Sequence, residues 1–104
     1  MSVNKNMVFV IEDARGKNLL PAMEHGELRV ILSGKEEPWQ AMEKLREGLS
    51  RMTSDDSLLL IGNPLHIAIA SHVAFTRLGG KVRFLTWDRN RYAYNITEVS
   101  YDHE

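Results

Sequence analysis

The sequence predicts an α/β fold: a single small domain with a mixed, mostly parallel sheet of about five strands, helices on the sheet faces and a C-terminal β-hairpin. Residues 57–88 read as a strand, a tight turn, a helix, a Gly79-Gly80 stop and a second strand, which is the order of a right-handed βαβ crossover. Upstream, short apolar runs alternate with helical patterns. Downstream, a polar turn joins two alternating runs, which is typical of a hairpin.

Length and composition indicate one globular domain over residues 1–104. Of the 104 residues, 43% are hydrophobic and 26% are charged, and the formal net charge of −1 gives no general attraction to nucleic acid or to an anionic membrane. The absence of cysteine excludes disulfides, a thiolate nucleophile and Cys-ligated zinc. No apolar run approaches the ~20 residues of a membrane helix. We therefore expect a cytoplasmic protein without membrane contact or cofactor, with flexible ends at 1–6 and 101–104.

The N-terminal half is predicted to hold two strands and two helices. The strands cover 7–11 and 28–32, where apolar and β-branched residues gather. A short helix follows the cap residue Asn18 and stops at Gly26. The first long helix begins near Pro38. Its apolar residues fall on one predicted face and are Trp39, Met42, Leu45, Leu49 and Met52.

The second long helix, which starts at Pro64, is apolar in nearly every direction around its axis. Such a helix is normally buried on all sides, and a domain of this size has little chain with which to cover it. We therefore predict a homodimer through this helix, with the interface formed by Ile67, Ala70, Val73 and Ala74. The alternative is that the chain's own long helix or N-terminal segment covers it.

The turn Gly62-Asn63-Pro64 lies between a predicted parallel strand and a helix, where ligands commonly bind in α/β proteins. Free N–H groups at the helix start favour an anion or a nucleotide, bound by Gly62, Asn63 and His66. The alternative is an Asn63 cap followed by proline in the first helical position, which is an ordinary helix start.

No catalytic or metal-binding motif is present. His66 and His72 point in different directions from one helix, and no zinc pattern occurs, so we expect no metal site. Two acidic doublets occur, Glu12-Asp13 at a strand end and Asp55-Asp56 in a turn. The first is better placed for catalysis, but no partner base or nucleophile is assignable, and we predict no catalytic residue.

The C-terminal hairpin combines aromatic rings with cations, a mixture that can stack bases and neutralise phosphates. The candidate nucleic-acid-binding residues are Arg83, Trp87, Arg89, Arg91, Tyr92 and Tyr94. Strand alternation over 82–87 and 92–99 places both tyrosines on one face, with Trp87 expected on the other. Packing between strands is the alternative role of these rings.

The motif Gly62-Asn63-Pro64, the helix after it and the segment Leu85-Thr86-Trp87-Asp88-Arg89 resemble small uncharacterised proteins of tailed bacteriophages. Asn18, Pro21-Ala22 and Gly26-Glu27-Leu28 extend the likeness over most of the chain. The resemblance implies a viral origin and action in the cytoplasm of an infected bacterium, and it assigns no site residue.

These observations predict a phage accessory protein that binds a host or phage macromolecule without catalysis, as a homodimer. One alternative is a nucleic-acid-binding protein that uses the basic aromatic hairpin. The other is a small nucleotide-binding or hydrolysing domain that uses the turn at Gly62.

Overall fold

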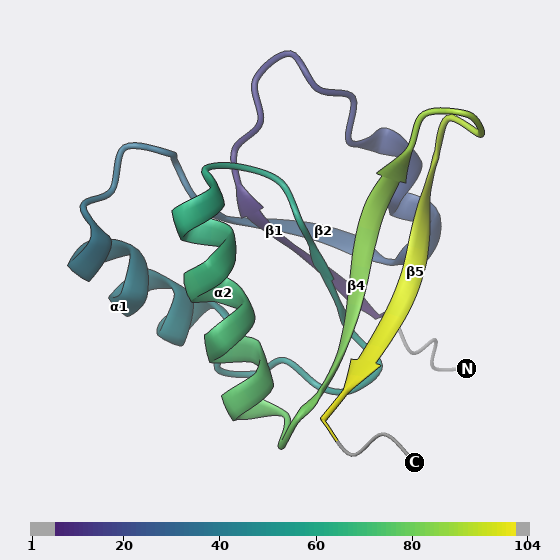
Figure 1. Cartoon of the computed structure of the whole chain (residues 1–104). Coiled ribbons are helices and arrows are strands. Elements are labelled where there is room, and N and C mark those ends of the chain that lie inside the picture. Colours follow the sequence, from purple (N-terminus) through teal and green to yellow (C-terminus); the bar gives the residue numbers. More distant parts are fainter. Residues whose placement is uncertain (1–5, 102–104) are drawn as a thin grey trace, which may run out of the picture.

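The computed structural model describes residues 6–101, so 1–5 and 102–104 of the predicted flexible ends lie outside the described residues. Five strands and three helices follow one another along the chain (Figure 1). They are β1 (Met7–Glu12), the 3-10 helix η1 (Leu20–His25), β2 (Glu27–Leu32), α1 (Pro38–Gly48), β3 (Ser57–Leu59), α2 (Pro64–Arg77), β4 (Lys81–Asp88) and β5 (Ala93–Ser100).

The strands form one mixed sheet in the order β2-β1-β3-β4-β5. β1 pairs in parallel with β2 and β3, β3 pairs in parallel with β4, and β5 runs antiparallel to β4. The predicted fold class, including the crossover and the hairpin, is confirmed.

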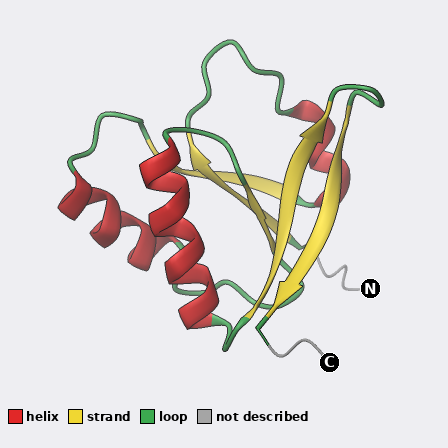
Figure 2. Ribbon diagram, viewed as in Figure 1, coloured by secondary structure: helices red, strands yellow, loops and turns green. Residues whose placement is uncertain are grey.

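Strand order explains why the helices lie on different faces. The connections through α1 and α2 both lead toward β4, whereas the connection through η1 leads the opposite way, to β2. Because such crossovers are right-handed, opposite directions put helices on opposite faces. Accordingly, α1 and α2 lie together on one face, and η1 lies across the other (Figure 2).

Each face of the sheet has its own core. On the side of α1 and α2, strand residues such as Phe9, Ile11 and Leu58 pack against Leu45 and Ala74. On the side of η1, a smaller cluster gathers Val8, Val10, Ala22, Leu59, Leu85 and Tyr94. The Nε2 atom of His25, at the end of η1, lies 3.0 Å from the carbonyl oxygen of Tyr94, which joins η1 to β5.

The expectation that α2 is buried on all sides is wrong. One side of the helix is open, because Leu65 is 50% exposed and His72 is exposed. The other side packs within the chain, beside α1 and against the sheet. Ala70, Val73 and Ala74 belong to this core, so these side chains are not available to a second copy, and Ile67 is half-buried. The chain's own long helix covers α2.

Packing also departs from the predicted face of α1. Trp39 is 64% exposed, whereas Ala41, Leu45, Leu49 and Met52 are buried. Trp39 lies in the first turn of the helix, and the residues from Ala41 onward supply the contacts with the core instead.

At the C-terminal end, the ring of Tyr101 stacks on Phe75 with 4.8 Å between ring centroids, and its N–H donates to the carbonyl of Gly80. One strand boundary needs correction. Tyr92 was expected in the last strand, but it lies in the preceding turn with a φ of 50°. At the other end of the described chain, the carbonyl oxygen of Asn6 accepts a hydrogen bond from Glu27.

Candidate functional site

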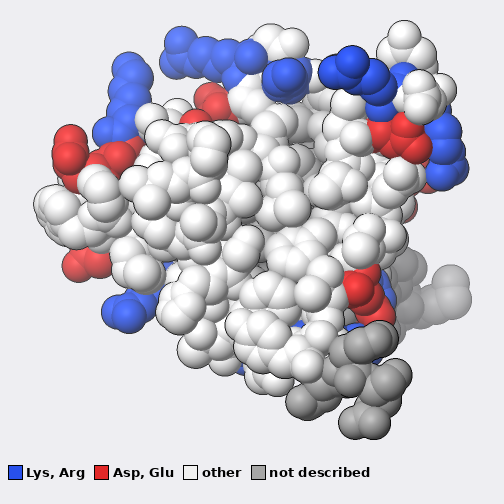
Figure 3. Space-filling model, viewed as in Figure 1, with Lys and Arg blue, Asp and Glu red and all other residues white. Residues whose placement is uncertain are grey.

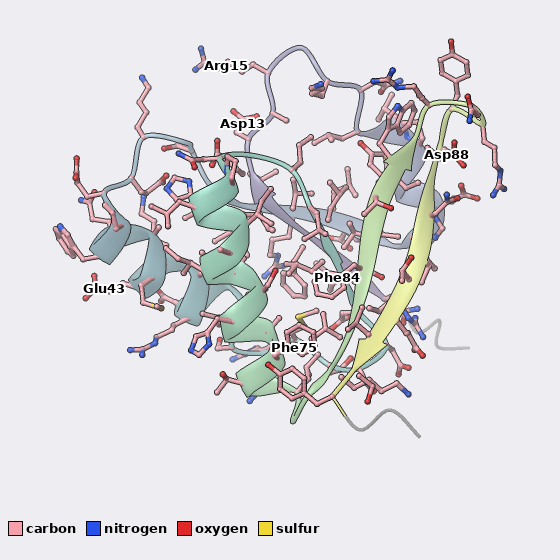
Figure 4. The ribbon with its side chains drawn as sticks, in the orientation of Figure 1. Asp13, Arg15, Glu43, Phe75, Phe84 and Asp88 are labelled. Atoms are coloured by element: carbon pink, nitrogen blue, oxygen red, sulfur yellow. The ribbon has the colours of Figure 1, made fainter. Side chains whose placement is uncertain are left out.

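The candidate site lies at the carboxyl edge of the parallel strands, where the strand order reverses between β1 and β3. In open α/β sheets, ligands bind outside the carboxyl ends of the strands at such a reversal. Asp13 and Arg15 follow β1 at this end, near the start of α2, and Asp88 marks the end of β4 beyond them (Figure 4).

Glu12 and His66 form a buried pair at this reversal. Nδ1 of His66 lies 2.6 Å from Oε1 of Glu12, and the side chains are only 3% and 13% exposed. The same carboxylate oxygen accepts the backbone N–H of Asn63 at 3.2 Å. Because an ionised carboxylate only accepts hydrogen bonds, Nδ1 of His66 carries the proton. The pair therefore ties the end of β1 to the start of α2.

Two glycines make room for this carboxylate. A Cβ atom on Gly62, which has a φ of +125°, would lie 2.6 Å from the Cβ of Glu12. A Cβ atom on Gly34, after β2, would lie 3.0 Å from Oε2 of the same residue. Two loops, after β2 and after β3, thus close around one side chain.

Two of the three residues predicted to bind an anion, Asn63 and His66, already have a partner within the chain. Glu12 accepts hydrogen bonds from Asn63 and His66 and lies against Gly62, so the carboxylate of the chain stands where an external anion was expected. The Asn63 side chain accepts the N–H of Leu65, and Pro64 opens the helix. The alternative of an ordinary helix start is the arrangement observed.

A cavity of about 350 Å³ opens at the same edge, on the face that carries η1. Its walls come from the end of β3, the end of the hairpin and the loop after β1. The lining residues are Gly16, Lys17, Asn18, Leu59, Leu60, Ile61, Trp87 and Tyr94.

Trp87 and Tyr94 both line this cavity, so the prediction that they lie on opposite faces of the hairpin is wrong. They are direct partners across β4 and β5, and their ring centroids are 5.0 Å apart in an edge-to-face arrangement. Tyr94 is buried and its pKa is raised by that burial, whereas Trp87 is 44% exposed. Tyr92, in the turn, makes a second edge-to-face contact with Trp87, with 6.2 Å between the ring centroids. Packing and an exposed aromatic surface therefore coexist on this hairpin.

Exposed cations lie along the carboxyl edge of the sheet, and one of them, Lys17, lines the cavity. They follow the carboxyl ends of three strands and are Arg15 and Lys17 after β1, Lys35 after β2, and Arg89 and Arg91 after β4. Figure 3 shows Lys and Arg side chains along this upper edge, above a broad surface with few charges. Within residues 6–101, the side chains of Arg15, Lys17, Lys35 and Arg89 have no acidic partner.

Several acids at this edge are held by internal hydrogen bonds. Burial alone would raise the pKa of Glu36, but the N–H groups of Ser33 and Gly34 and the ammonium of Lys44 hold that pKa well below its usual range. A hydrogen bond from the Asn95 amide lowers the pKa of Asp88. These carboxylates stay ionised while their oxygens are occupied, and the cations project outward.

Arg83 does not belong to this edge. It lies near the opposite end of β4, where its guanidinium contacts Glu98 at 3.4 Å and the carbonyl of Asp55 at 3.3 Å. Its Nε atom is buried without a hydrogen-bond partner among the described residues. The candidate nucleic-acid surface therefore loses Arg83 and gains Lys17, which sequence reasoning missed because only the fold brings the loop after β1 beside the hairpin.

Metal and membrane sites receive no support from the described chain. Residues 6–101 contain no group of three His, Asp or Glu side chains arranged to hold a metal ion. No helix in this range is long and apolar enough to cross a bilayer. The second acidic doublet has a structural role, since Asp56 accepts the N–H groups of Met7 and Thr53.

The fold and the site together define a small α/β protein. The Glu12–His66 contact occupies the point where its strand order reverses, and the neighbouring edge of the sheet is basic and aromatic. The family model described as Phage Pam3 gp32-like protein matches residues 6–101, and the chain belongs to this family. It is thus a phage protein, as the resemblance in its sequence implied. No curated protein and no solved structure matches the chain.

Proposed function

We propose that this phage protein is an accessory protein that binds single-stranded nucleic acid along the carboxyl edge of its sheet. One observation carries the proposal: the half-exposed ring of Trp87 borders a cavity at the same edge as the outward-pointing cations Lys17, Arg15 and Arg89. Aromatic platforms beside backbone-tracking cations are the usual means of binding single strands.

The combination favours a single strand over a duplex. A ring such as Trp87 can stack only on a base whose face is free, and the bases of a duplex are already stacked on each other. The cations need no sequence information, because they meet phosphates. With a formal net charge of only −1 on the whole chain, the attraction must come from this edge and not from the molecule as a whole.

Two other expectations receive less support. A nucleotide-hydrolysing site at Gly62 would need donors that Glu12 already uses. A homodimer stays a prediction, without the interface first expected on α2, because Ala70 and Ala74 are fully buried within the chain.

A salt series tests the proposal. Binding of a fluorescently labelled oligothymidylate, followed by anisotropy, should weaken steeply as salt rises from about 50 to 200 mM. The double variant Arg89→Ala, Arg91→Ala should bind less tightly, and its plot of log affinity against log salt should lose about 1.4 from its slope, since each single-strand phosphate contact contributes about 0.7.

A matched control comes from the other side of the molecule. Arg46 and Arg77 are also exposed, lie in the last turns of α1 and α2, and lack an acidic partner within the described chain. Arg46→Ala with Arg77→Ala removes the same charge and should leave the slope unchanged. Absent binding at low salt, or equal slopes for both double variants, would sink the proposal.

A further inference from the structure

We infer that the cavity beside Trp87 holds one unstacked base of the bound strand, an inference that rests on the proposed function and adds a specific binding site to it. The basic edge alone would bind any polyanion. The cavity adds a site for a planar heteroaromatic group.

The lining suits such a group in size and polarity. A volume of about 350 Å³ lies within the range of small-molecule sites, about 300–1,000 Å³. Leu59, Leu60 and Ile61 give an apolar wall, and Trp87 and Tyr94 give an aromatic one. Such surfaces bind the faces of a base, because every base has a π-face and few polar groups there.

Strand backbone beside the cavity that has no hydrogen-bond partner within residues 6–101 can pair with the edge of a base. β3 ends at Leu59, whereas β4 continues to Asp88. The N–H of Leu60 donates to the carbonyl of Leu85, so the backbone groups of Leu85 face β3. Alternation directs the N–H and C=O of Trp87 to the same side, where β3 has already ended.

The opposite strand supports this assignment. Tyr94, the direct partner of Trp87 in β5, turns its carbonyl away from β4 toward Nε2 of His25. Trp87 and Tyr94 are therefore a pair that exchanges no backbone hydrogen bonds. The N–H and C=O of Trp87 are thus placed to pair with a donor and an acceptor on the edge of a base.

Polar groups at the cavity suit the rest of a nucleotide. Lys17 lines the cavity and has no acidic partner among residues 6–101, so its ammonium can meet the phosphate attached to the inserted base. Asn18 accepts the N–H of Leu20 through Oδ1, which leaves its amide NH₂ as a donor. The site therefore provides a wall for the face, backbone for the edge and a cation for the phosphate.

The test compares two polyanions on one protein. In a Trp39→Phe background, Trp87 is the sole tryptophan, and the exchange is mild because Trp39 is exposed. Oligothymidylate should change the emission of Trp87 and bind at least about fivefold more tightly than an abasic strand of equal length, as expected for one stacked base. The abasic strand should leave the emission unchanged.

A variant that fills the cavity provides a second test of the base site. Ile61→Phe should reduce the difference in affinity between the two strands, whereas Leu65→Phe, on the open side of α2, should not. Should Ile61→Phe fail to fold, the comparison of strands on the parent protein decides alone. Equal affinities with no change in Trp87 emission would overturn the base site and the stacking role of Trp87 in the proposed function. Only the phosphate binding that the salt series on the Arg89 and Arg91 variant measures would then remain. Failure of both strands to bind would overturn both.

Discussion

Glu12 is the residue on which the candidate site depends. Its carboxylate is almost enclosed, accepts hydrogen bonds from two residues of the next loop and helix, and fixes the proton on Nδ1 of His66. This contact fills the usual ligand position of an α/β sheet from within the chain, which moves the open surface to the neighbouring cavity.

Replacing Glu12 should therefore destabilise the fold. Glu12→Ala leaves the buried His66 without its acceptor and should lower the free energy of unfolding by about 1–3 kcal/mol. Glu12→Gln keeps an acceptor and should lose less. Urea denaturation measures both, with Asp13→Ala, its exposed neighbour, as a control expected to change stability by less than about 0.5 kcal/mol. Equal losses at Glu12 and Asp13 would refute the structural role.

Glu36 should make stability depend on pH in the acid range. Its folded pKa lies below its ordinary value of 4.5, so its stabilisation is complete above that pH and is lost as the pH falls toward the folded pKa. Glu36→Gln should consequently lose less stability than the parent between about pH 5 and 2. Thermal unfolding over this range is the measurement, and the exposed Glu43→Gln variant, which should behave as the parent does, is the control.

At the scale of elements, the loop between β3 and α2 has little freedom. Gly62→Ala should cost about 1–3 kcal/mol, because the backbone conformation excludes a side chain and the new methyl would meet Glu12. Gly16→Ala is the matched change, since Gly16 also has a positive φ but nothing within 4 Å of the new atom. Chemical denaturation of both variants should show the larger loss at Gly62. A larger loss at Gly16 would contradict the packing described around Glu12.

Elements were predictable from the sequence where local chemistry decides them. Pro38, Pro64 and Gly26 mark helix ends, and runs such as 7–11 mark strands, so the order of elements and the crossover followed directly. Side-chain exposure did not follow, because it depends on neighbours: Trp39 has the right spacing but is 64% exposed. Tyr92 fits the alternating pattern of the last strand, yet it lies in the hairpin turn with a positive φ.

The candidate site could be predicted only in parts. Glu12 and His66 each appeared as isolated candidates, and their pairing requires β1 to lie beside β3, which no local pattern reveals. The same holds for Lys17 and Trp87, which are far apart along the chain and share one cavity. Both contacts depend on the order of the strands in the sheet, which the sequence pattern did not reveal.

On the scale of the whole molecule, the charged side chains of this nearly neutral chain are unevenly distributed over its surface. Cations gather along the carboxyl edge, and the face over α2 and the hairpin carries few charges (Figure 3). A protein arranged in this way should engage a polyanion along one edge only.

An NMR titration of ¹⁵N-labelled protein with oligothymidylate tests this claim most directly. The account predicts amide shifts confined to the loop after β1, around Arg15, Lys17 and Asn18, and to the hairpin end from Trp87 to Tyr92, with α1 and the last turns of α2 unchanged. Shifts centred on α1 and α2, or no shifts at low salt, would contradict it.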